Sequence, residues 1–255
     1  CGAFWAHAFE KLRKGLIFLS DILISGYYGF KNSGDDALLL AIVQDLKKYK
    51  PDVSLEVLSK APKETSSVYG VKAIDRMNPF AVIGGIRRCK MLLSGGGTLI
   101  QDRTSTKSLL YYLTIIKTAH LLGKKVMLYS NGIGPLREEH REMTRKVLNK
   151  ADIITLRDEA SLKELESLGV DKPEIILTAD PAFDIECTKD GTRLLKGLGI
   201  FPDEKYVCFS VRNWKKASDN FCDEIAAAAD YIMNKYKYKV CFLPMQPEKD
   251  TEITH

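Results

Sequence analysis

Short apolar runs rich in β-branched residues alternate along this chain with longer segments of helical periodicity. The runs are DILISG (21–26), VSLEVLS (53–59), KMLLSG (90–95), KKVMLYS (124–130), DIITL (152–156), EIILT (174–178), YVCFSV (206–211) and KVCFLPM (239–245). Amphipathic helices are expected between them, over about 35–49, 105–122, 138–149, 159–168 and 219–236. This alternation predicts an α/β fold, a parallel β-sheet with crossover helices.

The alternation breaks once, near residues 183–189. Pro181 and the polar run behind it interrupt the periodicity. We therefore predict a Rossmann-like first domain over 21–183 and a second Rossmann-like domain that begins at residue 184. Residues 184–255 are too few for a doubly wound domain, so the second domain is expected to be truncated. Residues 1–20 fit neither domain and are treated as an N-terminal extension.

Composition excludes several classes of protein. Of the 255 residues, 45% are hydrophobic and 28% are charged, which is typical of a globular protein. The net charge of +5 suits anionic small molecules or a membrane surface, but it is too small for a nucleic-acid binder. The six cysteines form no CxxC pair and the four histidines no HExxH motif, so we expect no metal site and a reduced, cytoplasmic protein. No apolar stretch reaches the ~18 residues that span a bilayer.

The loop after the first predicted strand, GYYGFKNSGDD (26–36), is acidic. Gly29 and Gly34 have the spacing of a phosphate-binding loop, but Asp35 and Asp36 stand where that motif needs Lys and Ser or Thr. Two carboxylates repel phosphate and suit hydroxyl groups. Either Asp could act as a base toward a sugar hydroxyl, and helix capping alone is the alternative. The loop also lacks the G-x-G-x-x-G pattern of dinucleotide-binding proteins.

Two glycine-rich loops follow later strands. Three consecutive glycines in SGGGTLIQD (94–102) favour a close approach of backbone to a ligand, and Gln101 and Asp102 supply polar groups behind them. SNGIGP (130–135) contributes Asn131 and Gly132, although a simple turn into the next helix explains it equally well. Carboxyl ends of parallel strands are where ligands bind in such sheets, so these loops are candidate site segments.

Two arginines also follow predicted strands, Arg157 in the first domain and Arg212 in the second. A guanidinium binds a carboxylate or phosphate through two parallel hydrogen bonds, so the pair indicates a small polyanionic ligand. The alternative for Arg157 is a structural pairing with Asp158 or Asp180.

Taken in order, these motifs resemble the polysaccharide pyruvyl transferase family, particularly its CsaB type. The resemblance runs from Ile22 to Met245 through SGYYGFKNSGDDALL, SGGGTLIQD, SNGIGP, TLRDEASLKELESLGV, TADPAF and FSVRNW. It implies two Rossmann-like domains in a GT-B-like arrangement. It also implies transfer of the enolpyruvyl unit of phosphoenolpyruvate to an N-acetylmannosamine-like sugar of a cell-wall polysaccharide precursor, where it closes as a ketal. In the CsaB type the pyruvylated polymer anchors surface-layer proteins.

The resemblance gives each candidate residue a role. Asp35 and Asp36 are the expected catalytic residues, and Arg157 and Arg212 are expected to bind the donor. The expected acceptor-binding residues are Gly29, Asn32, Gly34, Gly95, Gly96, Gly97, Gln101, Asp102, Asn131 and Gly132. Phosphoenolpyruvate is a substrate, and no cofactor is expected.

The resemblance also implies partners and a place of action. The second substrate is a lipid-linked or soluble cell-wall glycan precursor, so peripheral contact with the inner face of the membrane is expected. The family's second domain continues beyond this chain's last residue and supplies a His and a Lys that help to hold phosphoenolpyruvate. The 255-residue chain by itself is therefore expected to be nearly inactive.

Three other functions compete with this interpretation. A GT-B glycosyltransferase that uses a nucleotide sugar would share the fold and differ in its donor. A sugar-binding module without catalysis would keep the glycine-rich loops and would not depend on Asp35 or Asp36. A nucleotide-dependent oxidoreductase is the least supported, because no dinucleotide-binding pattern follows the first strand.

Overall fold

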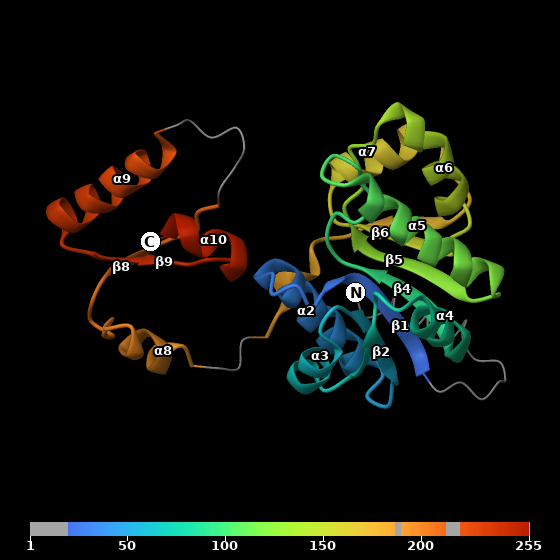
Figure 1. Ribbon diagram of the computed structural model, residues 1–255, viewed down its shortest axis with the longest axis horizontal. Coiled ribbons are helices and arrows are strands. Elements are labelled where there is room, and N and C mark those ends of the chain that lie inside the picture. Colours follow the sequence, from blue (N-terminus) through green and yellow to red (C-terminus); the bar gives the residue numbers. More distant parts are fainter. Residues whose placement is uncertain (1–19, 187–189, 213–219, 255) are drawn as a thin grey trace. The chain divides into compact units, whose positions relative to one another are not determined.

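The computed structural model describes residues 20–186, 190–212 and 220–254, and these form two compact units (Figure 1). The first unit contains the chain up to Phe30 together with Asp35–Ile185. The second contains Lys31–Gly34 together with the residues from Glu186 onward. Apart from Ser20, the predicted N-terminal extension lies outside the described residues.

The first unit is built on a parallel seven-stranded sheet in the order β3-β2-β1-β4-β5-β6-β7. Its strands are β1 (Ser20–Tyr28), β2 (Leu55–Ser59), β3 (Lys72–Asp75), β4 (Cys89–Gly95), β5 (Lys125–Asn131), β6 (Ile153–Leu156) and β7 (Glu174–Leu177). This is the order of a doubly wound, Rossmann-like sheet. The prediction of an α/β fold with a parallel sheet is thereby confirmed.

Helices connect successive strands of this sheet. They are α2 (Ser33–Tyr49), α3 (Pro62–Tyr69), α4 (Pro79–Arg88), α5 (Thr106–Leu121), α6 (Glu138–Leu148) and α7 (Glu159–Leu168), with a 3-10 turn, η1 (Pro181–Asp184), after the last strand. Four of the six helices, α2 and α5 to α7, were expected from periodicity. The segment of α3, β3 and α4 was not, because β3 is a four-residue strand with exposed ends and has no apolar run.

Side chains of each central strand alternate between two apolar layers. On β1, Ile22 and Ile24 pack with α2, whereas Leu23 packs in the layer that contains α4 to α7. All three side chains are completely buried. Because both faces of the sheet are covered near β1 and β4, these strands appear in the sequence as continuous apolar runs. Each buried Leu or Ile contributes about 1.5–3 kcal/mol to folding.

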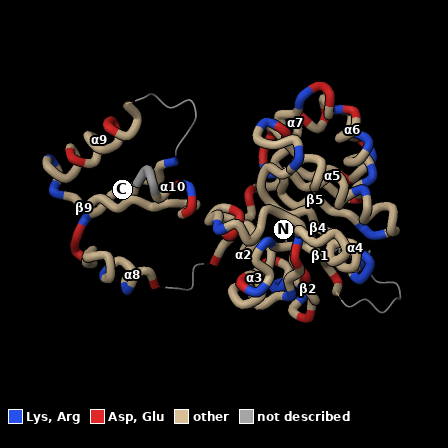
Figure 2. Tube along the Cα trace, viewed as in Figure 1, with Lys and Arg blue, Asp and Glu red and all other residues tan. Residues whose placement is uncertain are grey.

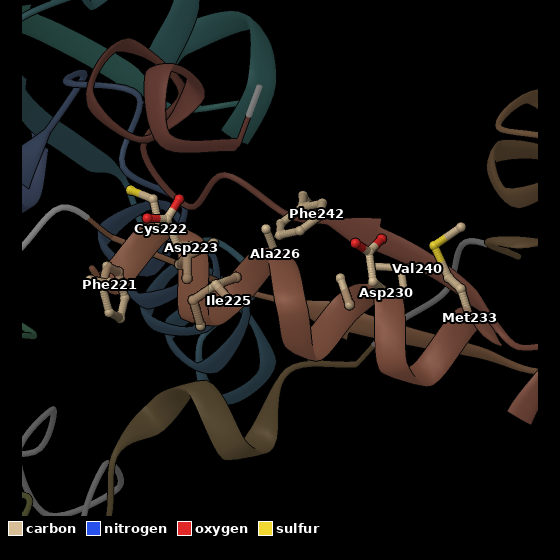
Figure 3. A pocket seen from close by; sticks show the side chains of 11 residues that line it. Phe221, Cys222, Asp223, Ile225, Ala226, Asp230, Met233, Val240 and Phe242 are labelled. Carbon is tan, nitrogen blue, oxygen red and sulfur yellow. The ribbon is translucent and has the colours of Figure 1, made fainter. Parts of the chain in front are cut away.

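The second unit is smaller in its described part. Strands β8 (Tyr206–Phe209) and β9 (Lys239–Phe242) pair in parallel, and α9 (Phe221–Tyr236) connects them. Two short helices, α8 (Thr192–Gly197) and α10 (Pro247–Thr254), flank this β-α-β unit. A cavity of about 430 Å³ lies between α9 and β9, lined by apolar side chains that include Ile225, Met233 and Phe242 (Figure 3). Across the described parts of both units, none of the helices has the length and apolar character to cross a bilayer.

Candidate functional site

The strand order of the first unit reverses between β1 and β4. The chain leaves β1 for β2 on one side, whereas β4 lies on the other side and continues toward β5. Loops after two such strands diverge, and the crevice between them is where doubly wound sheets bind ligands. The acidic loop after β1 and the triple-glycine loop after β4 are therefore the two segments at this point.

The three glycines after β4 allow α2 to approach the loop closely. A Cβ on Gly95 would lie 2.8 Å from Cδ1 of Ile42, and one on Gly96 would lie 3.0 Å from Cβ of Leu38. Gly96 and Gly97 also have φ angles of 62° and 73°, in the left-handed region that favours glycine. The glycine run thus brings bare backbone against the N-terminal half of α2.

Asp35 in that first turn faces the glycine loop. A Cβ on Gly97 would lie 3.5 Å from Oδ1 of Asp35. Tyr28, the last residue of β1, donates a hydrogen bond from its hydroxyl to the Gly95 carbonyl oxygen at 2.8 Å. Burial raises the pKa of Tyr28 well above its ordinary value, and the negative charge of Asp35 raises it further. The carboxylate of Asp35 therefore lies at the point where the strand order reverses.

Asp36 has different surroundings. The Tyr69 hydroxyl at the end of α3 donates to the Asp36 carbonyl oxygen at 3.4 Å. Burial raises the pKa of the Asp36 carboxyl, the charge of Glu64 on α3 raises it as well, and a hydrogen bond from Tyr69 acts in the opposite direction. Since successive helical residues are about 100° apart, the two carboxylates diverge, Asp35 toward the glycine loop and Asp36 toward α3.

Arg157, at the end of β6, joins three loops at the same edge of the sheet. Its Nη1 donates to Oδ2 of Asp180 at 3.0 Å, and its Nη2 donates to Oγ1 of Thr98 at 2.8 Å. A Cβ on Gly132 would lie 2.5 Å from Thr98 Oγ1, so only glycine fits beside this contact. Of the two structural partners left open for Arg157, Asp180 is the one that accepts a hydrogen bond. The Asp158 carboxylate lies 3.6 Å from Arg157 Nε and caps α7.

Two of the predicted acceptor-binding residues, Asp102 and Asn131, have buried side chains that hydrogen bond to neighbouring loops. Asp102, 1% exposed, accepts from the Arg137 backbone N–H at 3.1 Å and lies 2.6 Å from Nδ1 of His140. Asn131 is fully buried, and its Nδ2 donates to the Ser94 carbonyl oxygen at 3.2 Å. Both buried side chains stabilise the loops after β4 and β5 through these hydrogen bonds. The sequence motifs alone do not indicate this structural role.

The other predicted acceptor-binding residues are spread over both units. Gln101 is partly exposed and accepts a backbone N–H three residues further on. A Cβ on Gly29 would lie 2.3 Å from Oγ of Ser59, so this glycine packs against the end of β2. Asn32 and Gly34 belong to the second unit, and Oδ1 of Asn32 accepts from the Gly34 N–H at 3.1 Å. The structure therefore places only part of the predicted set beside Asp35.

Arg212 follows β8 in the second unit. Its Nη2 donates to Oε1 of Gln246 at 2.5 Å, and its Nε lies 3.4 Å from Oδ1 of Asp250. Gln246 and Asp250 are buried, whereas about half of the Arg212 side chain is exposed. The two polar residues orient the guanidinium and leave part of it open to solvent. Sequence reasoning missed both: Gln246 lies in the loop after β9, and Asp250 lies in the first turn of α10.

A sequence model described as "Polysaccharide pyruvyl transferase" matches residues 32–255, which is most of the chain and covers the first unit from Asp35 onward and the second unit from Asn32. The chain belongs to the polysaccharide pyruvyl transferase family. The resemblance inferred from the loop motifs is thus confirmed at the level of the family. No curated protein sequence matches this family member significantly.

Solved structures similar to this pyruvyl transferase family member include nucleotide-sugar enzymes. A putative UDP-N-acetylglucosamine 2-epimerase from Listeria monocytogenes is 14% identical with a TM-score of 0.54, over 92% of this chain and 66% of that one. The UDP-GlcNAc 2-epimerase from Neisseria meningitidis bound to UDP-GlcNAc is 12% identical with a TM-score of 0.57, over 92% and 68%.

The wall teichoic acid polymerase TagF is 9% identical with a TM-score of 0.54, over 88% of this chain and 56% of that one. The chain therefore spans about two thirds of the epimerases and a little over half of TagF. At these identities the likeness shows the fold alone.

Proposed function

We propose that this protein transfers the enolpyruvyl unit of phosphoenolpyruvate to a sugar of a cell-wall polysaccharide precursor and closes it as a ketal. The family match over residues 32–255 carries the proposal. An acidic loop at the β1–β4 reversal supports it, because a carboxylate there suits a neutral, hydroxyl-bearing acceptor better than a phosphate. An N-acetylmannosamine-like acceptor of the CsaB type, and a role in anchoring surface-layer proteins, are the finer form of the proposal.

The reaction needs two additions to the same carbon. A sugar hydroxyl oxygen attacks C2 of phosphoenolpyruvate while the methylene carbon takes up a proton and becomes a methyl group. A second hydroxyl of the sugar then displaces the phosphate from C2, which leaves a cyclic ketal and inorganic phosphate. Each attacking hydroxyl gives up a proton, so a base beside the acceptor and negative charge near the cationic carbon both favour the reaction.

Asp35 is the proposed base. Its carboxylate faces the Gly97 backbone at the reversal point, whereas the Asp36 carboxyl lies toward Tyr69 and Glu64. The glycine backbone is buried and packs against Leu38 and Ile42 of α2, so the partly exposed Asp35, and not the loop backbone, is the group proposed to meet the acceptor. We therefore assign the acceptor to the first unit and give Asp36 a supporting role.

Arg212 is the proposed donor-binding residue. Gln246 and Asp250 orient its guanidinium, and about half of the Arg212 side chain is exposed. The guanidinium can therefore bind a carboxylate or phosphate while it keeps its contacts with Gln246 and Asp250. Arg157 is the second candidate. It is expected to contribute less to donor binding, because both of its Nη groups already donate hydrogen bonds to protein atoms. The donor thus belongs to the second unit, and the epimerase-like fold supports a GT-B-like architecture with one domain for each substrate.

A glycosyltransferase that uses a nucleotide sugar is the alternative. It is favoured by the likeness to epimerases, one of which is bound to UDP-GlcNAc. The fold does not decide between the two donors, since related Rossmann-like domains bind many ligands.

Donor choice can be measured by thermal unfolding of the full-length protein. Phosphoenolpyruvate is expected to raise the unfolding midpoint, since a ligand at 100 times its Kd stabilises the folded state by about 2.7 kcal/mol. UDP-GlcNAc is expected to leave the midpoint unchanged, and inorganic phosphate controls for simple anion effects. Stabilisation by UDP-GlcNAc without any by phosphoenolpyruvate would identify the glycosyltransferase as the correct alternative.

A further inference from the structure

An open groove of about 610 Å³ lies between α4 and α5 in the first unit. Its lining is mostly apolar and includes Val82, Ile86 and Ile115. Met77 in the lining is 59% exposed, and Phe80, which follows the lining residue Pro79 on α4, is 87% exposed. A cluster of exposed apolar side chains around an open groove marks an interaction surface. The proposed transfer reaction makes no use of it.

The segment that forms the groove is strongly basic. Residues 76–125 contain nine Lys and Arg side chains and a single acidic residue, Asp102, which is buried against His140. Three of these cations pair with acidic side chains outside the stretch, Arg88 with Glu56, Lys90 with Asp21 and Lys125 with Asp152. The two cations in the groove lining are Arg76 and Lys107. Figure 2 shows Lys and Arg on α4, and Lys107 at the start of α5 is an exposed residue of the groove lining. Its partner should therefore be anionic as well as apolar.

A buried cation forms part of the groove. Arg76 is 7% exposed, and its guanidinium lies 4.5 Å from the ring centre of Tyr111 and 5.1 Å from that of Phe30. Its Nη1 donates to the Gly26 carbonyl oxygen at 2.6 Å, while its Nε has no hydrogen-bond partner within the described part of the chain. No acidic side chain among those residues lies within ion-pair distance of Arg76. Its Nη2 donates to the Tyr112 hydroxyl at 3.4 Å. A buried arginine whose partners are a carbonyl, a hydroxyl and aromatic rings, with no carboxylate among them, can accept an anion.

We propose that this surface docks the protein on an anionic lipid bilayer. The docking face consists of Met77, Phe80, Ile83, Lys107 and Leu110. Exposed apolar side chains beside cations are the features that bind a protein at the boundary between headgroups and acyl chains. A bilayer supplies phosphates for Lys107 and Arg76 and an apolar layer for Phe80 in the same place. The proposal holds whether or not the protein transfers pyruvyl groups.

Vesicle sedimentation of the whole protein tests the docking face. The protein is expected to sediment with vesicles of phosphatidylcholine and phosphatidylglycerol, to remain in solution with phosphatidylcholine alone, and to dissociate as salt rises. Phe80→Ser and Lys107→Glu should each reduce vesicle binding, and the double variant should reduce it at least ~10-fold. All the changed side chains are exposed, so the unfolding midpoint should not change.

Matched controls lie on α3, outside the docking face. Val68→Ser removes another exposed apolar side chain, and Lys63→Glu reverses another exposed charge. Both are expected to bind vesicles like the unchanged protein. Equal losses in the control and docking-face variants would overturn the proposal, as would binding that is indifferent to phosphatidylglycerol. A protein that ignores vesicles but dimerises, and becomes monomeric on Phe80→Ser, would assign the groove to a second copy of the chain.

Discussion

Replacing Asp35 with Asn is expected to lower turnover of phosphoenolpyruvate roughly 100- to 10,000-fold, the range typical for loss of a general base. Asn keeps the size of the side chain but cannot take up the hydroxyl proton. Asp35 is the carboxylate that faces the glycine loop at the reversal of the strand order, which is why the larger effect is assigned to it. The measurement is the rate of phosphate release in the full-length protein with its acceptor glycan present.

Asp36→Asn is the matched control, since the two residues share the first turn of α2. Its turnover is expected to fall less than ~10-fold, because the Asp36 carboxyl lies toward α3. Burial raises the pKa of Asp36 in the folded state, so the folded protein binds this proton more tightly and loses stability as the pH rises through that pKa. Asp36→Asn should therefore not lower the unfolding midpoint through loss of this charge at neutral pH. If both variants only lower the midpoint and turnover per folded molecule is unchanged, helix capping is their role.

Arg212→Ala is expected to weaken phosphoenolpyruvate binding by roughly 10- to 150-fold, since a charge-assisted hydrogen bond contributes about 1.5–3 kcal/mol. Arg212→Lys should recover only part of this loss, because an ammonium keeps the charge but not the planar pair of donors. Titration calorimetry with phosphoenolpyruvate gives the Kd of each variant directly.

A control arginine and a stability measurement complete that experiment. Arg193→Ala changes an exposed arginine of α8 in the same unit, and its Kd for phosphoenolpyruvate should equal that of the unchanged protein. Arg212→Ala also takes a cation from the buried Asp250 carboxylate, so its unfolding midpoint must be measured alongside. An unchanged Kd in folded Arg212→Ala protein would remove Arg212 from the donor site.

The sequence predicted the sheet best where both faces of a strand are buried. β1, β4 and β5 form continuous apolar runs, and their predicted bounds agree with the structure within one or two residues. The segment of α3, β3 and α4 lacks such runs. Its remaining signals are local ones: Pro62 at the start of α3, the left-handed Gly70 behind it, and Asn78, which caps α4.

The candidate site was harder to predict than the sheet. Loop positions after strands indicated Asp35, Asp36 and Arg157, but neighbouring positions could not show which carboxylate faces the glycine loop. That distinction depends on the packing of Leu38 and Ile42 against the glycines. The burial of Asp102 likewise comes from contacts between loops far apart in the sequence, which no local pattern contains.

Product analysis tests the central claim most directly. The full-length protein is incubated with phosphoenolpyruvate and its acceptor glycan, or with UDP-GlcNAc and the same glycan, and the glycan is examined by NMR. We expect phosphoenolpyruvate to give a ketal methyl signal on the glycan, with one phosphate released for each ketal formed, and UDP-GlcNAc to give no new product. Transfer of a sugar from UDP-GlcNAc, with phosphoenolpyruvate left unconsumed, would contradict the assignment.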